Sequence, residues 1–230
     1  DRLRSRGLGD VYKRQMYDND RGILISRLLN AQKRISGPSR AVKWMLTDIH
    51  KERSELIHMQ DISGDFIRTL SGENGKLYPI KYITNPESDK LTQKIAQQYK
   101  DKSIIGLCTV SKQKDKDMPI QTTIDIINKL NSQGKTVFYF GAGKACQDYA
   151  TELKKNGCLK FVDLTNVTTI NELANVMQLC EAVISIDTGT MHLAYATGVP
   201  TVCVFYRKEM IKKWAPRKSL YKSTVVIDND

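Results

Sequence analysis

The pattern of apolar and polar positions is most regular after Ser103, where short apolar runs alternate with amphipathic segments. The runs predict buried strands, and the segments between them carry apolar residues at helical spacing. The predicted strands span residues 104–110, 136–140, 159–164, 182–186, 201–205 and 224–227. The predicted helices span residues 119–133, 145–155 and 169–179, with a shorter one following 187. This alternation predicts an α/β fold with a doubly wound parallel sheet and helices on both faces.

The pattern is weaker before Ser103. Residues 1–15 show no apolar periodicity and are expected to be a non-native or disordered head. Residues 23–29 fit either a helix or a buried strand–helix junction, and residues 47–70 have apolar spacing that favours a helix. Ser88 is the expected cap of a further helix that ends near Tyr99.

Three polar loops follow predicted strands, at residues 109–118, 141–144 and 187–192. In parallel sheets of this kind ligands bind beyond the carboxyl ends of the strands. The three loops are therefore expected to converge on one ligand. The glycines of 141–144 do not complete a dinucleotide fingerprint, because Cys146 stands at its last position.

The third loop has the features of an anion site. Asp187, Thr188 or Thr190 can cap the short helix, whose first N–H groups and dipole favour a phosphate. His192 lies within the first turn, close enough to share that ligand. The simpler alternative is that Asp187 is an ordinary cap and His192 a half-buried, hydrogen-bonded histidine.

Residues 187–200 resemble the D-T-G-x-x-H-L-A-x-A-x-G-x-P signature of glycosyltransferase family 9, the heptosyltransferase-like enzymes, and every fixed position is present. The first loop is similar to the family's Lys-x-Trp-Pro phosphate loop, with Met118 in place of the tryptophan after Lys116. A third similarity, to a Leu-Phe-Gly motif, has Tyr206 in place of the glycine. We expect that change to narrow or reshape the donor pocket.

The resemblance implies a GT-B-like architecture of two Rossmann-like domains, the N-terminal one truncated. Under this interpretation residues 16–85 are a partial, acceptor-side N-terminal domain and residues 86–102 a connecting helix or linker. Residues 103–230 are the C-terminal domain that binds a nucleotide-sugar donor.

The resemblance also implies a glycosyltransferase. It would move a sugar, heptose by preference, from a nucleotide-diphosphate donor of the ADP-heptose type to a lipopolysaccharide-core or related glycan acceptor. No metal or other cofactor is implied. The implied donor- and phosphate-binding residues are Thr109, Ser111, Lys116, Gly141, Asp187, Thr188, Gly189, Thr190 and His192. The catalytic base stays unknown, since the family's N-terminal aspartate has no counterpart in this sequence.

A metal-dependent route would use an Asp-x-Asp pair, and Asp115 with Asp117 is the serious candidate because it lies in the first loop. Lys114 and Lys116 flank these carboxylates, so we favour neutralisation by lysine over a metal. The alternative to the enzyme is a non-catalytic remnant of the same fold that binds a nucleotide or a glycan.

Composition adds limits to this picture. The net charge of +11 is scattered, with no basic stripe studded with aromatic residues, so nucleic acid is not an expected partner. Five cysteines without C-x-x-C spacing predict buried free thiols in a reducing cytoplasm. No run of 18 apolar residues appears. The expected location is the cytoplasm, with peripheral contact with the inner membrane surface left open.

Overall fold

The structure is a computed structural model that describes residues 20–30, 32, 34–36, 42–49, 58–62, 64 and 79–227. The chain divides into two compact units, Asp1–Leu77 and Tyr78–Asp230. The predicted head, residues 1–15, lies outside the described residues.

The N-terminal unit contains short elements. Helix α2 (Asp20–Leu28) resolves the choice left open by the sequence, because residues 23–28 are helical. Strands β1 (Ile35–Ser36) and β2 (Asp48–Ile49) pair in parallel, separated by the 3-10 turn η1 (Lys43–Met45). The helix predicted over 47–70 is therefore wrong at its start, and helix appears only at 59–62 and 64 among the described residues of that range. The backbone of Asp48 pairs with Ile35 across the chain, and that tertiary pairing overrides the local apolar spacing.

A six-stranded parallel sheet forms the centre of the C-terminal unit, in the order β5-β4-β3-β6-β7-β8. All five neighbouring pairs are parallel. The strands are β3 (Ile104–Cys108), β4 (Thr136–Tyr139), β5 (Val162–Asp163), β6 (Ala182–Ile186), β7 (Thr201–Phe205) and β8 (Ser223–Ile227). The predicted doubly wound α/β sheet is confirmed.

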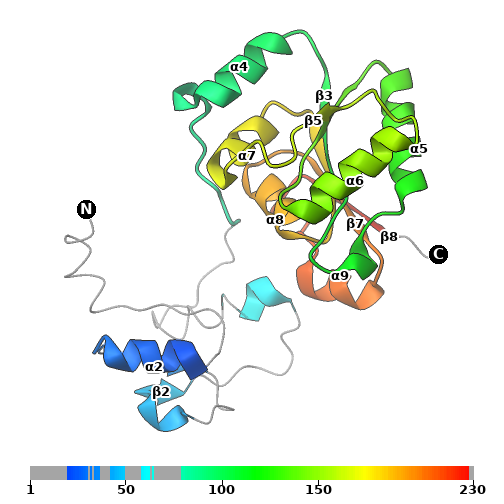
Figure 1. Cartoon of the computed structure of the whole chain (residues 1–230). Helices are drawn as coiled ribbons and strands as arrows, with labels where there is room; N and C mark the ends of the chain where they lie inside the picture. The colour runs from blue at the N-terminus through cyan, green and yellow to red at the C-terminus, as the bar shows by residue number, and fades with distance from the viewer. Residues whose placement is uncertain are drawn as a thin grey trace. The chain divides into compact units, whose positions relative to one another are not determined.

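Helices cover both faces of this sheet (Figure 1). They are α4 (Lys90–Gln98), α5 (Ile120–Ser132), α6 (Lys144–Lys155), α7 (Ile170–Met177), α8 (Gly189–Ala196) and α9 (Lys208–Trp214), with the 3-10 turns η2 (Pro86–Ser88) and η3 (Lys114–Lys116). One core layer lies beneath α4, α7 and α8, and the opposite layer beneath α5 and α6. Helix α9 packs with α8 over β7.

Strand β4 illustrates how sequence sets the two layers. Phe138 joins the core under α4 and α7, whereas its neighbours Val137 and Tyr139 join the core under α5 and α6. All three side chains are fully buried. Side chains alternate between the faces of a strand, so a continuous apolar run serves a sheet that is covered on both sides.

The strand order contains a switch point. The chain runs outward from β3 to β4 and β5, then returns to the other side of β3 for β6, β7 and β8. Cys108 at the end of β3 pairs with Ser185 in β6. The loops that follow these two strands therefore begin side by side and lead to opposite halves of the sheet, the arrangement that opens a ligand crevice in α/β proteins.

Two local predictions need correction. Asp89, not Ser88, caps α4: its side chain accepts the N–H groups of Leu91 and Thr92, while Ser88 ends η2. The strand predicted at 159–164 is only Val162–Asp163. Edge strand β5 pairs with β4 alone, which limits the hydrogen bonds available to it.

The cysteine prediction is confirmed, since all five cysteines are free and buried. Burial raises the pKa of the Cys108 thiol to about 12. Among the residues that the structure describes, no helix combines the length and the apolar character needed to cross a bilayer.

Candidate functional site

The loop after β3 is anchored at both of its ends. The N–H of Met118 donates to the carbonyl of Thr109 at 2.9 Å, and the Tyr149 hydroxyl donates to the Met118 carbonyl at 2.6 Å. Met118, which stands where the family pattern has tryptophan, is buried beside Ile186 and Val204. The methionine therefore fixes the loop from below, next to the end of β6.

Polar contacts then shape the loop itself. The N–H of Ser111 donates to Asp117 Oδ1 at 2.6 Å, and the N–H of Gln113 donates to the Ser111 hydroxyl at 3.1 Å. The bond from Ser111 to Asp117 spans the turn η3, which contains Lys116. The hydroxyl of Ser111 is thus already an acceptor within the loop, and its predicted donation to a phosphate stays a prediction.

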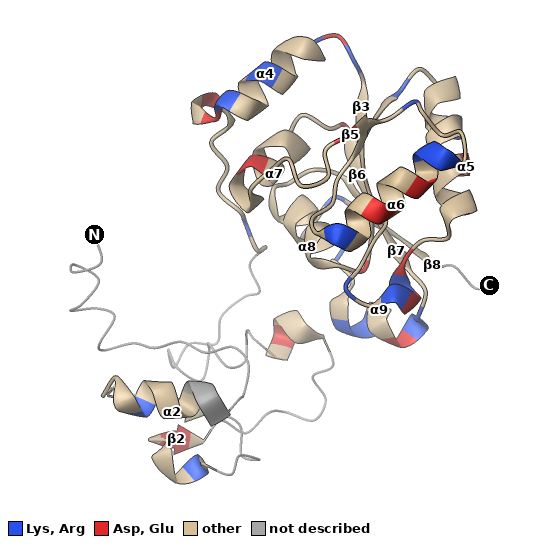
Figure 2. Cartoon of the chain, in the orientation of Figure 1, with Lys and Arg blue, Asp and Glu red and all other residues tan. Residues whose placement is uncertain are grey.

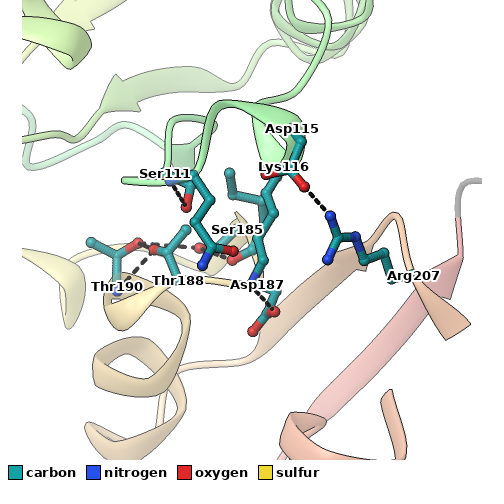
Figure 3. A network of polar contacts seen from close by, with 10 residues as sticks. Ser111, Asp115, Lys116, Ser185, Asp187, Thr188, Thr190 and Arg207 are labelled. Carbon is teal, nitrogen blue, oxygen red and sulfur yellow. Dashed lines mark hydrogen bonds and ion pairs between the residues drawn. The ribbon is translucent and has the colours of Figure 1, made fainter. Parts of the chain in front are cut away.

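The loop after β6 leads directly into α8. Of the three candidate caps, Thr188 occupies the cap position, and its hydroxyl accepts the N–H of Thr190 at 3.2 Å. The hydroxyls of Thr188 and Thr190 lie 2.8 Å apart, and that of Thr190 lies 3.3 Å from the Ser185 hydroxyl. Figure 3 shows these three hydroxyls next to one another at the start of the helix. A Cβ at Gly189 would meet nothing within 4 Å, so the backbone at the first turn is open to an approaching group.

An ion pair joins the two loops across the switch point. Lys116 Nζ donates to Asp187 Oδ2 at 2.7 Å, and the two side chains are only 18% and 10% exposed. The residues are far apart in sequence, yet they meet because their loops leave the adjacent strands β3 and β6 (Figure 3). The two predicted residues with opposite charge are therefore brought together by the fold.

The second predicted loop, 141–144, lies on the other side of β3. The N–H of Gly143 donates to Asn166 Oδ1 at 2.6 Å, which ties this loop to the segment after β5. A Cβ at Gly141 would lie 2.6 Å from the Cβ of Cys146, so the glycine is required by close packing of α6. Its predicted place beneath a donor nucleotide stays a prediction.

Thr109 is fully buried at the end of β3, and its hydroxyl lies 2.8 Å from the Tyr139 hydroxyl. Burial raises the pKa of Tyr139, so the phenol stays protonated. This hydroxyl pair links β3 to β4 beneath the loops. Donation from Thr109 to a phosphate stays a prediction.

His192 faces aromatic residues. Its Nδ1 lies 2.6 Å from the Tyr195 hydroxyl, and its ring meets that of Trp214 edge-on at 5.7 Å between centroids. Burial also raises the pKa of the Tyr195 phenol. The contact agrees with the simpler alternative of a hydrogen-bonded histidine, and its predicted share in the ligand stays a prediction.

The structure adds a fourth loop, after β7. Arg207 stands at the N-cap position of α9 and forms an ion pair with Asp115, next to Lys116 in the first loop. Asp115 was considered from the sequence as a metal ligand, but Arg207 was not singled out. A signal in the sequence was the departure from the family motif at Tyr206, because Arg207 is the next residue of the same loop.

The loops after β3, β6 and β7 form a small cleft at the carboxyl edge of β6 and β7. It is lined by Lys116, Asp187, Phe205, Tyr206, Arg207 and Met210 and has a volume of about 10 Å³, enough for one water molecule. Two of its lining residues, Lys116 and Arg207, are cationic. With the open first turn of α8, the surface around the cleft therefore offers ammonium, guanidinium and backbone donors, the groups that bind an anion with several oxygen atoms.

The chain matches the family model described as glycosyltransferase family 9 (heptosyltransferase) over residues 75–228. Over a segment of 77 residues it is 38% identical to the lipooligosaccharide heptosyltransferase 2 of Campylobacter jejuni. That segment is 32% of this chain and 24% of the relative. The matched segment is thus about a quarter of the relative's length.

Two solved structures are similar in fold. The alignment with a glycosyltransferase family 9 protein from Veillonella parvula covers 97% of this chain and 65% of that protein, with a TM-score of 0.79 and 16% identity. The alignment with the ADP-heptose LPS heptosyltransferase II of E. coli covers 90% of this chain and 65% of that protein, with a TM-score of 0.71 and 17% identity. These likenesses support the GT-B-like fold. The family match extends over more than half of the sequence and includes both loops of the ion pair, so this chain belongs to glycosyltransferase family 9.

Proposed function

We propose that the C-terminal unit binds the diphosphate of a nucleotide-sugar, and that the protein transfers the sugar, a heptose, to a lipopolysaccharide-core or related glycan acceptor. The observation that carries this proposal is the Lys116–Asp187 ion pair across the β3/β6 switch point. It holds a cation where an α/β sheet binds ligands, beside the first turn of α8. The E. coli relative is named for ADP-heptose, which makes ADP the first nucleotide to test.

The chemistry follows from where charge develops. When a glycosyl group leaves a nucleoside diphosphate, negative charge accumulates on the departing diphosphate oxygens. Donors that are already in place stabilise that charge more in the transition state than in the ground state. Lys116 and the N–H of Gly189, the first residue of α8, are the donors we assign to this role.

Asp187 acts in this proposal as a positioning residue. An ammonium group has three N–H donors, and the contact with Asp187 uses one of them. The other donors stay available for phosphate oxygens while the lysine is held in one direction. Asp187 therefore orients Lys116 and is not proposed to remove a proton from the acceptor.

The proposed reaction needs no metal, because protein groups neutralise the diphosphate. Asp115 pairs with Arg207, and Asp117 accepts the N–H of Ser111, so both carboxylates of the Asp-x-Asp pair already have partners in the protein. No cofactor beyond the donor is proposed. Ligand-induced stabilisation should be the same in EDTA and in Mg²⁺.

We place the protein in the cytoplasm, where nucleotide-sugars are available and five buried thiols stay reduced. Basic residues lie along α9 (Figure 2). They favour contact with anionic partners, such as a phosphorylated acceptor or the inner membrane surface. Glycan and donor are thus the proposed partners, and nucleic acid is not.

Thermal unfolding with ADP, UDP and ADP-heptose tests the binding step. A ligand that binds only the folded state at 100 times its Kd adds about 2.7 kcal/mol of stability. We expect ADP-containing ligands to raise the melting temperature, and Lys116→Ala or Asp187→Ala to abolish the shift. His192→Ala tests the predicted contact between His192 and the ligand and should also abolish the shift. Lys112→Ala, an exposed lysine of the same loop, is the matched control and should keep the shift.

Absence of stabilisation by every nucleotide and nucleotide-sugar would refute the proposal. Binding without sugar transfer, measured with a version of the protein that includes the family's N-terminal aspartate, would instead support the non-catalytic remnant. Transfer should be followed with donor and a heptose-accepting glycan, measuring release of nucleoside diphosphate.

A further inference from the structure

We propose that Arg207 is a second diphosphate-binding residue, held ready by Asp115 and released to the donor when the donor arrives. This inference rests on the proposed function and adds to it a specificity-determining residue in a loop that departs from the family pattern. Neither the signature at 187–200 nor the phosphate loop includes this position.

The position of Arg207 follows from strand register. Val204 in β7 pairs with Ile186 in β6, so the chain leaves both strands at the same edge of the sheet. Asp187 lies one residue beyond Ile186, and Arg207 lies three residues beyond Val204. The buried Phe205 fixes the end of β7, and α9 begins directly after Arg207. The arginine is therefore carried by an anchored part of the fold.

Arg207 faces the loop that contains Lys116. Its Nη2 contacts Asp115 Oδ2, and it lines the same cleft as Lys116 and Asp187 (Figure 3). Two consecutive residues of that loop thus form ion pairs: Asp115 is the anion that pairs with Arg207, and Lys116 is the cation that pairs with Asp187. The four charges cancel in the absence of a ligand, and both cations belong to residues that line the cleft.

The Asp115–Arg207 pair is well placed to be exchanged. Its side chains are 51% and 47% exposed, so water screens the attraction and the pair contributes little stability. By contrast, Lys116 and Asp187 are largely shielded. A diphosphate carries more charge than one carboxylate, and a guanidinium with five N–H donors can bind two of its oxygens together. The more exposed pair is therefore the one expected to open.

Isothermal titration with ADP, AMP and inorganic pyrophosphate tests the assignment. We expect Arg207→Ala to weaken ADP and pyrophosphate binding about fivefold to tenfold, the loss of one charge-assisted contact, with a smaller effect on AMP. Arg207→Lys should recover part of the affinity, because it keeps the charge but loses the planar fork.

Asp115→Asn separates the two roles that the ion pair can have. If Asp115 competes with the diphosphate, its removal should tighten ADP binding about twofold to fivefold, the value of an exposed pair. If the ion pair only holds the loop in shape, Asp115→Asn and Arg207→Ala should weaken ADP binding equally, and the inference is then wrong. Circular dichroism and melting temperature verify that each variant is folded.

Two further variants complete the experiment. Lys208→Ala removes the adjacent exposed cation and should leave ADP affinity unchanged; a loss equal to that of Arg207→Ala would mean general attraction and overturn the assignment. Lys116→Ala reports on the site itself. If it abolishes binding while Arg207→Ala has no effect, the proposed function stands and this inference fails. If the unaltered protein binds neither ADP nor pyrophosphate, the proposed function fails as well.

Discussion

Gly141, in the loop that follows β4, is a position where one added carbon atom would have no room. A Cβ there would lie 2.6 Å from the Cβ and 2.8 Å from the Sγ of Cys146, which is buried. Since α6 must move to make room, we expect Gly141→Ala to destabilise the protein by about 1–3 kcal/mol, the usual cost of overpacking. Denaturant unfolding measures the loss.

Gly189 provides the matched control, because a Cβ at this first position of α8 would meet nothing within 4 Å. Gly189→Ala should change stability by less than about 0.5 kcal/mol. Equal losses for the two alanine variants would contradict the packing argument for Gly141.

At the residue scale, the sequence was most informative where a motif of the family supplied the residues. Lys116 and Asp187 were both predicted in the site from such motifs, and the fold places their charged groups 2.7 Å apart. The sequence did not indicate that Thr109 is fully buried against Tyr139, because burial at the end of a strand depends on neighbouring strands. Arg207 was missed for a related reason: its partner Asp115 lies in another loop, and a long-range pair leaves no local pattern.

At the scale of single elements, α4 depends on one carboxylate. Asp89 accepts the N–H of Leu91 at 3.0 Å, the hydroxyl of Thr92 at 2.6 Å and the amide of Asn175 at 3.0 Å. Asn175 belongs to α7 and is buried, so the same carboxylate caps α4 and joins the two helices. Burial alone would raise the pKa of Asp89, but the hydrogen bonds from Asn175 and Thr92 together lower it.

Replacement of this cap should therefore have a pH-dependent cost. We expect Asp89→Ala to lower stability by about 0.5–2 kcal/mol near neutral pH. Because the folded-state pKa lies below the unfolded value of about 3.9, the advantage of the wild type is complete above that pH and disappears as pH falls through the folded pKa. Unfolding curves from pH 7 to pH 3 measure it.

The exposed Asp101 gives the control for this series. Asp101→Ala should have little effect at any of these pH values. A constant difference between Asp89→Ala and wild type down to pH 3 would show that packing, rather than the charge of the cap, sets the cost.

Element types were predictable in the C-terminal unit and less so in the N-terminal one. Strands β3, β4, β6, β7 and β8 were predicted to within about two residues at each end, because each is a short, mostly apolar run. The helix predicted from Thr47 failed where Asp48 and Ile49 pair with β1. Apolar spacing in a window describes a preference of the segment, and the parallel partner that overrides it lies elsewhere in the chain.

At the scale of the whole molecule, the proposed donor site lies within one of the two compact units. Its cleft is lined by residues from Lys116 to Met210, all within Tyr78–Asp230. We therefore expect a fragment of residues 78–230 to unfold cooperatively and to bind ADP with the affinity of the full chain, within about a factor of three.

Calorimetric titration of the fragment and of the full chain measures this directly. Lys116→Ala in the fragment is the negative control. A folded fragment that has lost ADP binding would mean that residues before 78 contribute to the site.

The whole-molecule prediction was a parallel, doubly wound sheet, and it rested on the alternation of strands and helices along the chain. The all-parallel six-stranded sheet confirms it, whereas the strand order β5-β4-β3-β6-β7-β8 was not predicted. How the two units function together was not accessible in the same way, since the apolar pattern before Ser103 is irregular.

The switch point has a consequence for folding as well as for binding. Strands β3, β4 and β5 form one half of the sheet and β6, β7 and β8 the other, joined along β3 and β6. A diphosphate held by Lys116 and Arg207 would contact loops from both halves. Donor binding should thus oppose partial opening along this seam, so that amide hydrogens in β3 and β6 exchange more slowly in its presence. The bound ligand would then couple the two halves of the sheet, so that they unfold together.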